Sequence, residues 1–218
     1  MSVSPTVSLT KSAPTVSLEK SSTLGGLMRI NLNWNQNPSS PTPKAKKGFW
    51  AEFKEGYQMG QGRGPQGIDL DLGCLVEMQN GEKGVVQALG NSFGTLAEPP
   101  YIQLDQDDRT GQSTEGENLF LNLDNFKEIK RILIFAFIYE GAASWAQAEG
   151  VVTVFAPDGS QIVVKLDDFA GGNKMCGIAM ISNVGGQVSI SREVFYTAGH
   201  EYLDRKYGWG MQWVAGSK

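Results

Sequence analysis

From residue 68 onward, short stretches of alternating apolar and polar residues are separated by turn formers. A period of two places successive side chains on opposite faces of a strand, so each stretch predicts a half-buried β-strand. The turn signals include Asn80-Gly81, Asp158-Gly159 and Gly185-Gly186. The predicted strands cover residues 68–77, 84–88, 118–123, 129–139, 150–156, 161–165, 176–183 and 187–191. Many short strands at this spacing indicate an all-β fold, a two-sheet β-sandwich.

One late stretch has the spacing of a helix instead. Within residues 192–208, the side chains of Val194, Ala198, Tyr202 and Leu203 fall on one helical face. A glycine follows the charged last turn, as glycine often does where a helix ends. We therefore expect a minor helical segment near the C-terminus.

The start of the chain contains a two-copy repeat. Residues 5–11 read PTVSLTK, and residues 14–20 read PTVSLEK. Each copy alternates and contains β-branched residues, which predicts a short strand, and residues 27–34 predict another. The long Pro- and Gly-containing stretch that follows is typical of an insertion. The predicted organisation is N-terminal strands belonging to the sandwich in 1–34, a Pro/Gly-rich insertion or linker in 35–67, and the main sandwich domain in 68–218.

Composition and charge narrow the function classes. The 218 residues carry a formal net charge of −4, and the basic cluster KAKK at 44–47 lies in a Pro/Ser-rich stretch. Nucleic acid is therefore disfavoured as a partner, because phosphate binding needs a surplus of Lys and Arg. The longest apolar run, ILIFAFI at 132–138, is too short for a membrane span, and the N-terminus lacks the apolar core of a signal peptide. Cys74 and Cys176 lie in apolar surroundings, as buried thiols of a reducing compartment do, so we expect a soluble, cytoplasmic protein.

Carboxylates gather where predicted strands begin or end. Asp69 and Asp71 are two residues apart, so alternation places both on one face of a strand, while Leu70 and Leu72 point into the core. Like charges on one face repel each other unless a cation lies between them. Glu140 directly follows another apolar strand. These positions indicate a cation site at a strand end.

The densest acidic segment is residues 104–123, LDQDDRTGQSTEGENLFLNL. Its carboxylates are either solvated or bind a hard cation, which prefers oxygen ligands. No Cys/His cluster accompanies them, which disfavours zinc and iron. A continuous EF-hand does not fit, because the flanking segments are predicted strands rather than helices. Any ligands would instead converge from separate loops.

These motifs resemble a known family. IDLDLGCLV at residues 68–76 resembles the Asp-Leu-Asp strand of TerD-like tellurium-resistance and stress proteins. DDRTG at 107–111 resembles their Gly-Asp-Asn-x-Thr-Gly loop, and the paired TVSLTK and TVSLEK segments are similar to the short strands that begin those proteins. The ending, HEYLDRKYGWGMQWVAGSK, is most similar to the TerA branch. The resemblance covers most of the chain, with residues 35–67 outside it.

The resemblance implies a calcium-binding β-sandwich, with one or two ions, that acts in tellurite resistance and the general stress response. Its metal-ordered surface would be presented to partner proteins of a stress-response complex. The predicted metal ligands are Asp69, Asp71, Asp107, Asp108, Glu115, Glu117 and Glu140. The four aspartates match the family's motifs. Glu115 and Glu117 come from this chain's own loop, which continues with STEGEN where the family has Gly-Asp-Gly-Asp-Asp-Glu, and Glu140 comes from the end of an apolar strand.

We expect a protein that is not an enzyme. The single histidine, His200, lies one turn from Asp204, but no Ser or Cys stands in a nucleophile-elbow context. Two alternatives to the calcium hypothesis stay open. One is a metal-free assembly module that forms homo-oligomers through its N-terminal strands. The other is binding of a tellurium or sulfur species by Cys74 and Cys176.

Overall fold

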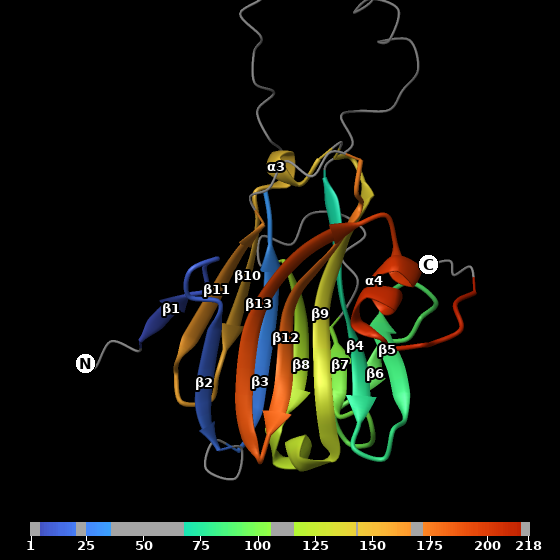
Figure 1. Cartoon of the computed structure of the whole chain (residues 1–218). Helices are drawn as coiled ribbons and strands as arrows, with labels where there is room; N and C mark the ends of the chain where they lie inside the picture. Colours follow the sequence, from blue (N-terminus) through green and yellow to red (C-terminus); the bar gives the residue numbers. More distant parts are fainter. Residues whose placement is uncertain are drawn as a thin grey trace, which may run out of the picture.

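The computed structural model describes residues 5–20, 25–35, 68–105, 116–142, 144–166 and 172–214. Within them, strands form two sheets that lie face to face (Figure 1). The predicted all-β, two-sheet sandwich is therefore confirmed.

The first sheet has seven strands in the order β1-β11-β10-β3-β8-β7-β6. Neighbouring strands are antiparallel except β1 and β11, which are parallel. The bounds are β1 Thr6–Ser8, β3 Leu27–Asn33, β6 Gly94–Thr95, β7 Ile102–Leu104, β8 Glu117–Asn122, β10 Gly150–Phe155 and β11 Gln161–Leu166. The short strands β6 and β7 are absent from the sequence-based prediction, because two or three residues carry too little alternation to recognise.

The second sheet has six strands in the order β2-β13-β12-β9-β4-β5, all antiparallel to their neighbours. The bounds are β2 Thr15–Lys20, β4 Asp69–Met78, β5 Lys83–Gln87, β9 Ile129–Glu140, β12 Met175–Val184 and β13 Gln187–Thr197. The two copies of the N-terminal repeat thus divide between the sheets, because β1 lies at the edge of the first and β2 at the edge of the second. The repeated leucine of each copy, Leu9 and Leu18, is buried.

The core between the sheets follows from the alternation along each strand. In β10, Val152 and Val154 are buried while the residues between them are partly exposed. Buried side chains from the inner faces of both sheets form one apolar cluster. Removing this apolar area from water is the main source of stability of the sandwich.

A second apolar cluster lies on the outer face of the six-stranded sheet. Leu75, Leu133 and Phe135 are buried there beneath Leu203 and Trp209. These two side chains belong to helix α4 (His200–Tyr207) and to the segment after it, which cover this face of the sheet (Figure 1). Strands β4 and β9 therefore bury side chains on both faces at their centre.

The predicted C-terminal helix starts later than its pattern indicated. Residues 192–197 continue β13, where Phe195 and Tyr196 pair with β12. Their β-branched and aromatic neighbours favour a pleated surface, and the pairing with β12 outweighs the apolar spacing of a helix. The helix α4 begins at His200 and ends before Gly208, whose φ of 67° is left-handed.

The remaining helical elements are short. The 3₁₀ helix η1 (Leu123–Glu128) connects β8 to β9, and α3 (Trp145–Ala148) precedes β10. In the part of the chain that the structure describes, none of the helices has the length and apolar character needed to cross a membrane.

Candidate metal site at the acidic end of the sandwich

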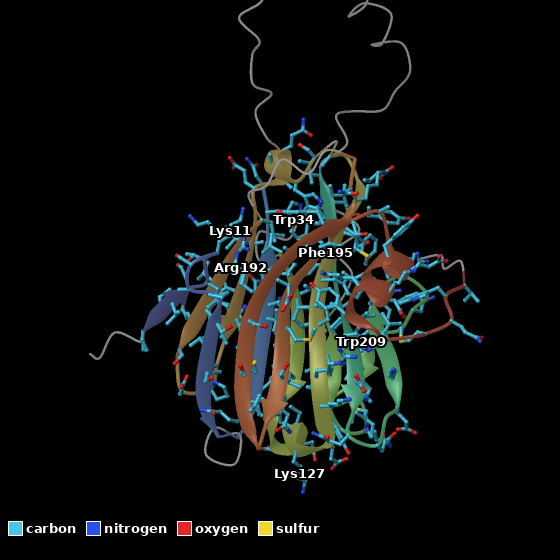
Figure 2. The ribbon with its side chains drawn as sticks, viewed as in Figure 1. Lys11, Trp34, Lys127, Arg192, Phe195 and Trp209 are labelled. Atoms are coloured by element: carbon cyan, nitrogen blue, oxygen red, sulfur yellow. The ribbon has the colours of Figure 1, made fainter. Side chains whose placement is uncertain are left out.

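The start of β4 is held at the end of the sandwich where α3 lies. The indole N–H of Trp34 donates to the carbonyl of Ile68 at 2.7 Å, which joins the end of β3 to the start of β4. Next to it, the Asn35 N–H donates to the Ala148 carbonyl at 2.8 Å. Trp34 is buried and lies at this end of the molecule (Figure 2). The two sheets are thereby fastened where the first acidic residues of β4 begin.

Three of the predicted ligands lie on the six-stranded sheet at this end. Asp71 is completely buried, with 0% of its surface exposed, while Leu70 and Leu72 on either side enter the core between the sheets. Asp69 lies opposite Glu140 in the β4–β9 register, and the register shifts between Asp69 and Leu70. Two acidic residues are therefore paired across neighbouring strands, and Asp69 lies two residues before the buried Asp71.

Glu117, the first residue of β8, brings a carboxylate from the opposite sheet. Its side chain is 1% exposed, and its Oε2 accepts a hydrogen bond of 2.6 Å from the Leu72 N–H. The β4–β5 ladder ends at Gly73, so the Leu72 N–H lies one residue beyond it. Glu117 thus links the two sheets through the backbone of β4, at the residue that follows the buried Asp71.

Gly116 determines where Glu117 enters the sheet. Its φ is +71°, and a Cβ at this position would lie 2.0 Å from the carbonyl oxygen of Leu32. Glu117 pairs with the same Leu32 in the β3–β8 register. Only glycine permits this conformation and this close approach, and the chain therefore leaves the acidic segment at a defined place.

Asp105, at the other base of the acidic segment, has a structural role. Its Oδ1 accepts a hydrogen bond from the Asn118 N–H at 3.0 Å, and its Oδ2 accepts one from the Asn118 side-chain amide at 2.8 Å. The Asp105 N–H donates in turn to the Asn118 carbonyl at 2.9 Å. This clamp holds residues 105 and 118, on either side of the acidic segment, next to each other. Asp105 was not predicted as a ligand, and its place before β8 gave no signal of the clamp.

The donor set fits a hard cation better than a transition metal. Oδ2 of Asp71 and Oε1 of Glu117 are buried oxygens that accept no hydrogen bond in the part of the chain that the structure describes, although both residues have other interactions. Carboxylate oxygens are the ligands that calcium prefers, and it takes six to eight of them. No group of three or more His, Cys, Asp and Glu side chains among the described residues could hold a metal by itself. The predicted ligands Asp107, Asp108 and Glu115 lie outside the described residues.

The histidine and the aspartate of α4 have separate partners. His200 Nε2 lies 2.7 Å from Oε1 of Gln87, and the ring packs edge-on against Phe135 at 5.4 Å. Burial lowers the pKa of His200 to about 4. The carboxylate of Asp204 instead accepts hydrogen bonds from the N–H groups of Gly210, Met211 and the Trp213 indole. A His–Asp pair is therefore not formed, and Asp204 fastens the C-terminal segment to the helix.

Both cysteines are buried in the core between the sheets. Cys74 and Cys176 each have 0% of their surface exposed and are free thiols. Burial raises the pKa of Cys74 to about 12, against a smaller lowering by a backbone hydrogen bond from Val86. Because the thiolate is the reactive and metal-binding form, this thiol is unreactive in the folded protein.

Solved structures share the two-sheet arrangement. The crystal structure of a homologue of telluride resistance protein (TerD) from Streptomyces coelicolor A3(2) matches with a TM-score of 0.51 and 18% identity, over 83% of this chain and 95% of that one. A protein of unknown function, SAV2460, matches with a TM-score of 0.53 and 15% identity, over 87% and 99% of the two chains. At these identities the likeness defines the fold, a TerD-like β-sandwich.

The sequence comparison identifies a particular relative. The chain is 41% identical over 212 residues to the tellurium resistance protein TerA of Alcaligenes sp.. The match covers 97% of this chain and 58% of that protein, so the chain spans little more than half of the relative's length. No protein-family model matches the chain. The chain is thus similar over nearly its whole length to a TerA protein, and the resemblance found in its motifs is confirmed.

Proposed function

We propose that this protein binds calcium at the acidic end of its sandwich and contributes to tellurite resistance and the stress response without being an enzyme. The observation that supports it best is that two buried carboxylates, Asp71 and Glu117, come from opposite sheets and lie one residue apart through the hydrogen bond from the Leu72 N–H to Glu117. The homology to TerA supports the tellurium part of the proposal.

The case for a cation rests on the cost of burying charge. A carboxylate removed from water is destabilising unless a positive charge or a metal ion compensates it. Two such groups, with Asp69 and Glu140 facing each other nearby, concentrate negative charge at one end of a sheet. A divalent ion neutralises this charge and requires only oxygen ligands, which is the donor chemistry present.

The residues proposed to hold the ion are Asp71 and Glu117 from the two sheets, with Asp69 and Glu140 beside them and Asp107, Asp108 and Glu115 from the loop. Bound calcium would neutralise their charge and fix the loop against the two strands. A loop ordered in this way is a surface that partner proteins of a stress-response complex would recognise only in the metal-bound state.

Calorimetric titration of EDTA-treated protein with calcium, repeated with magnesium, tests this site. We expect saturable calcium binding and much weaker magnesium binding, because calcium accepts the irregular geometry of a loop site more readily. The variants Asp71→Asn and Glu117→Gln should each weaken calcium binding by about tenfold or more. Asp158→Asn is the matched control, since Asp158 lies in the exposed turn between β10 and β11. Equal calcium affinity in all four proteins would overturn the site.

A positively charged side chain of the acidic segment would compete with calcium for these carboxylates. Arg109 is the only Lys or Arg in residues 106–115. If Arg109 alone compensated the buried carboxylates, Arg109→Gln would destabilise the protein strongly and calcium would produce no binding heat. In the calcium proposal, this variant retains saturable calcium binding.

A growth assay tests the tellurite part separately. Expression in a tellurite-sensitive bacterium, together with whatever partners the resistance requires, should allow growth on tellurite. The Asp71→Asn variant should lose this growth if resistance depends on calcium, whereas Asp158→Asn should retain it. Intact calcium binding without any growth on tellurite would refute the role in resistance and leave the metal site standing.

A homo-oligomer formed through the N-terminal strands is a second candidate function. The observation in its favour is that the two repeat copies form the edge strands β1 and β2 on the same side of the sandwich. Edge strands can pair with a second copy of the chain through their backbone groups. Light scattering of the full chain, with and without calcium, tests this, and a monomer under both conditions would rule it out.

A further inference from the structure

Three positively charged side chains converge at the edge of the sandwich. Lys11 comes from the connection between β1 and β2, Lys165 from β11 and Arg192 from β13. They line a pocket of about 440 Å³ together with the hydroxyl-bearing residues Ser8 and Thr10. Lys11 and Arg192 lie close together on this side of the molecule, far from Lys127 at the opposite end (Figure 2). The three cations belong to segments about 150 and 30 residues apart along the chain.

The N-terminal repeat builds this pocket by crossing from one sheet to the other. The Pro5 carbonyl accepts a hydrogen bond of 3.0 Å from the Gln161 N–H, at the start of β11. The equivalent Pro14 carbonyl of the second copy accepts one of 2.7 Å from the Arg192 N–H of β13. Between them, the Leu9 N–H donates to Val163 at 2.9 Å. The connection is therefore fixed to both sheets, and the two strands that carry Lys165 and Arg192 form its walls.

The charge of this pocket is opposite to that of the whole chain. The protein has a formal net charge of −4, yet the described residues that line the pocket include three cations and no carboxylate. Cations that line one pocket repel each other, and a bound anion or screening by solvent reduces this repulsion. Lys11 has a further interaction of its own, so we assign the anion contacts first to Arg192 and Lys165.

We propose that this pocket binds a small oxyanion with two negative charges, of the phosphate type. The planar fork of an arginine guanidinium matches two oxygens of such an anion, and a lysine ammonium adds a second, compact charge. The volume lies in the range of small-molecule sites and leaves room for an organic substituent on the oxyanion. Inorganic phosphate, tellurite and a phosphate ester share this chemistry, and the experiment separates them.

Two carboxylates in the sequence bear on this site. Asp167 and Asp168 follow β11 and lie outside the described residues. If their carboxylates formed ion pairs with the cations of the pocket, they would compete with an external anion for the same side chains. The double variant Asp167→Asn/Asp168→Asn therefore belongs to the test.

The test is a titration of the isotope-labelled, calcium-free full chain followed by the side-chain Nε–H signal of Arg192 in NMR spectra. Sodium phosphate, sodium tellurite and glycerol 1-phosphate are the ligands, and sodium chloride at equal ionic strength is the control. We expect saturable shifts with the oxyanions and none with chloride. An ester that binds about tenfold more tightly than inorganic phosphate identifies a phosphorylated metabolite, and the reverse order identifies a free oxyanion.

Variants assign the binding to named residues. Arg192→Gln should weaken phosphate binding by about tenfold, Arg192→Lys less, and Lys165→Gln by several fold, each measured through backbone amide shifts of Ser8 and Thr10. Lys127→Gln is the matched control and should leave the affinity unchanged, because Lys127 lies at the far end of the sandwich (Figure 2). The Asp167→Asn/Asp168→Asn variant should bind phosphate as tightly as the wild type or more tightly.

Three results would overturn the proposal. They are the absence of saturable shifts at millimolar phosphate, equal shifts with chloride, and phosphate binding only after Asp167 and Asp168 are changed. A variant that loses phosphate binding together with its wild-type amide spectrum would be replaced by Arg192→Lys, which keeps the charge and the backbone contacts. Calcium binding at the acidic end is independent of each of these results.

Discussion

The buried carboxylates at the two ends of β4 have neighbours of opposite charge. Near its end, Glu77 is buried between two cations of the neighbouring strand. Lys130 donates to Oε1 at 2.7 Å and Arg131 to Oε2 at 2.6 Å. At the start of the same strand, Asp71 is buried more completely and the nearby residues Asp69, Glu140 and Glu117 are acidic as well. One end carries its compensating charge in the strand beside it, whereas the other brings four acidic residues of β4, β8 and β9 to the same end of the sandwich.

The cationic end shows what a purely structural carboxylate requires. Arg131 also lies over the ring of Trp209, 3.9 Å from its centre, and donates to the Tyr207 carbonyl at 2.9 Å. The indole N–H of Trp209 donates to the Val76 carbonyl at 3.2 Å. Glu77 and Arg131 thus fasten the C-terminal segment to the sheet. In an arrangement of this kind, charged groups of the protein compensate one another, and no ligand is required.

The largest effect is expected at the cationic end. Arg131→Ala removes the ion pair, the contact with Trp209 and the bond to Tyr207, and it leaves Glu77 buried with Lys130 alone. We expect the free energy of unfolding to fall by about 3–5 kcal/mol, measured by urea unfolding, because one partner of a buried pair is lost.

Lys130→Ala is the matched control for this variant. The side chain of Lys130 is 55% exposed, compared with 25% for Arg131, so its loss should cost no more than about 1 kcal/mol. Equal losses in the two variants would mean that burial does not distinguish these cations, and the contrast between the ends of β4 would weaken.

The second predicted effect is stabilisation by calcium, which should depend on the acidic end of β4 and not on the end that carries Glu77. At a calcium concentration about one hundred times the dissociation constant, binding to the folded state should stabilise the wild type by about 2.7 kcal/mol. Glu77→Gln should retain this gain, whereas Asp71→Asn should lose most of it. Thermal unfolding with EDTA and with calcium measures both.

The sequence predicted much of the acidic end but not its burial. Alternation in IDLDLGCLV correctly places Leu70 and Leu72 in the core between the sheets. It does not predict that Asp71 is fully buried as well, because a strand pattern does not show which segments cover each face. The contact of Glu117 with Leu72 joins two sheets across 45 positions of sequence, and no local pattern contains it.

Tertiary pairing also explains the errors at the C-terminal side. The helical spacing of Val194 and Ala198 was a true pattern of apolar residues, but pairing with β12 makes residues 192–197 a strand. The convergence of Arg192 and Lys165 at one pocket depends on the same pairing and on the path of the N-terminal repeat. Neither position carries a sequence signal of binding, because Lys165 is a single cation at the end of a predicted strand and Arg192 is a single cation at the start of the predicted helical stretch.

A pH titration sharpens the contrast further. Burial opposes the charge of Glu77, but hydrogen bonds and attraction from Lys130 and Arg131 outweigh it and lower its pKa below 4.5. A carboxylate with a lowered folded-state pKa stabilises the protein above its unfolded-state pKa, and this contribution is lost as the pH falls through the folded-state value. We expect the unfolding free energy of the wild type to fall more steeply below pH 4.5 than that of Glu77→Gln. Parallel curves from urea unfolding across this range would contradict the assigned role of Glu77.

The smallest predicted effect is that of Asp69→Asn on the free energy of unfolding, and its sign should change when calcium is added. Asp69 lies opposite Glu140, and like charges directly opposite in an antiparallel pair are destabilising. In EDTA, Asp69→Asn should therefore raise the free energy of unfolding by about 0.5 kcal/mol. With saturating calcium the same variant should lower it, because a ligand carboxylate beside the ion is lost.

Asp158→Asn, outside the acidic end, should change little in either buffer. If Asp69→Asn destabilises the protein in both buffers, a group of the protein itself stabilises the carboxylate of Asp69. The carboxylate would then not depend on a bound calcium ion. The acidic end would then be of the same kind as the Glu77 end, with its cation supplied by the chain. A reversal of sign with calcium has no such explanation, because a fixed protein cation is present in both buffers and only the ion differs between them.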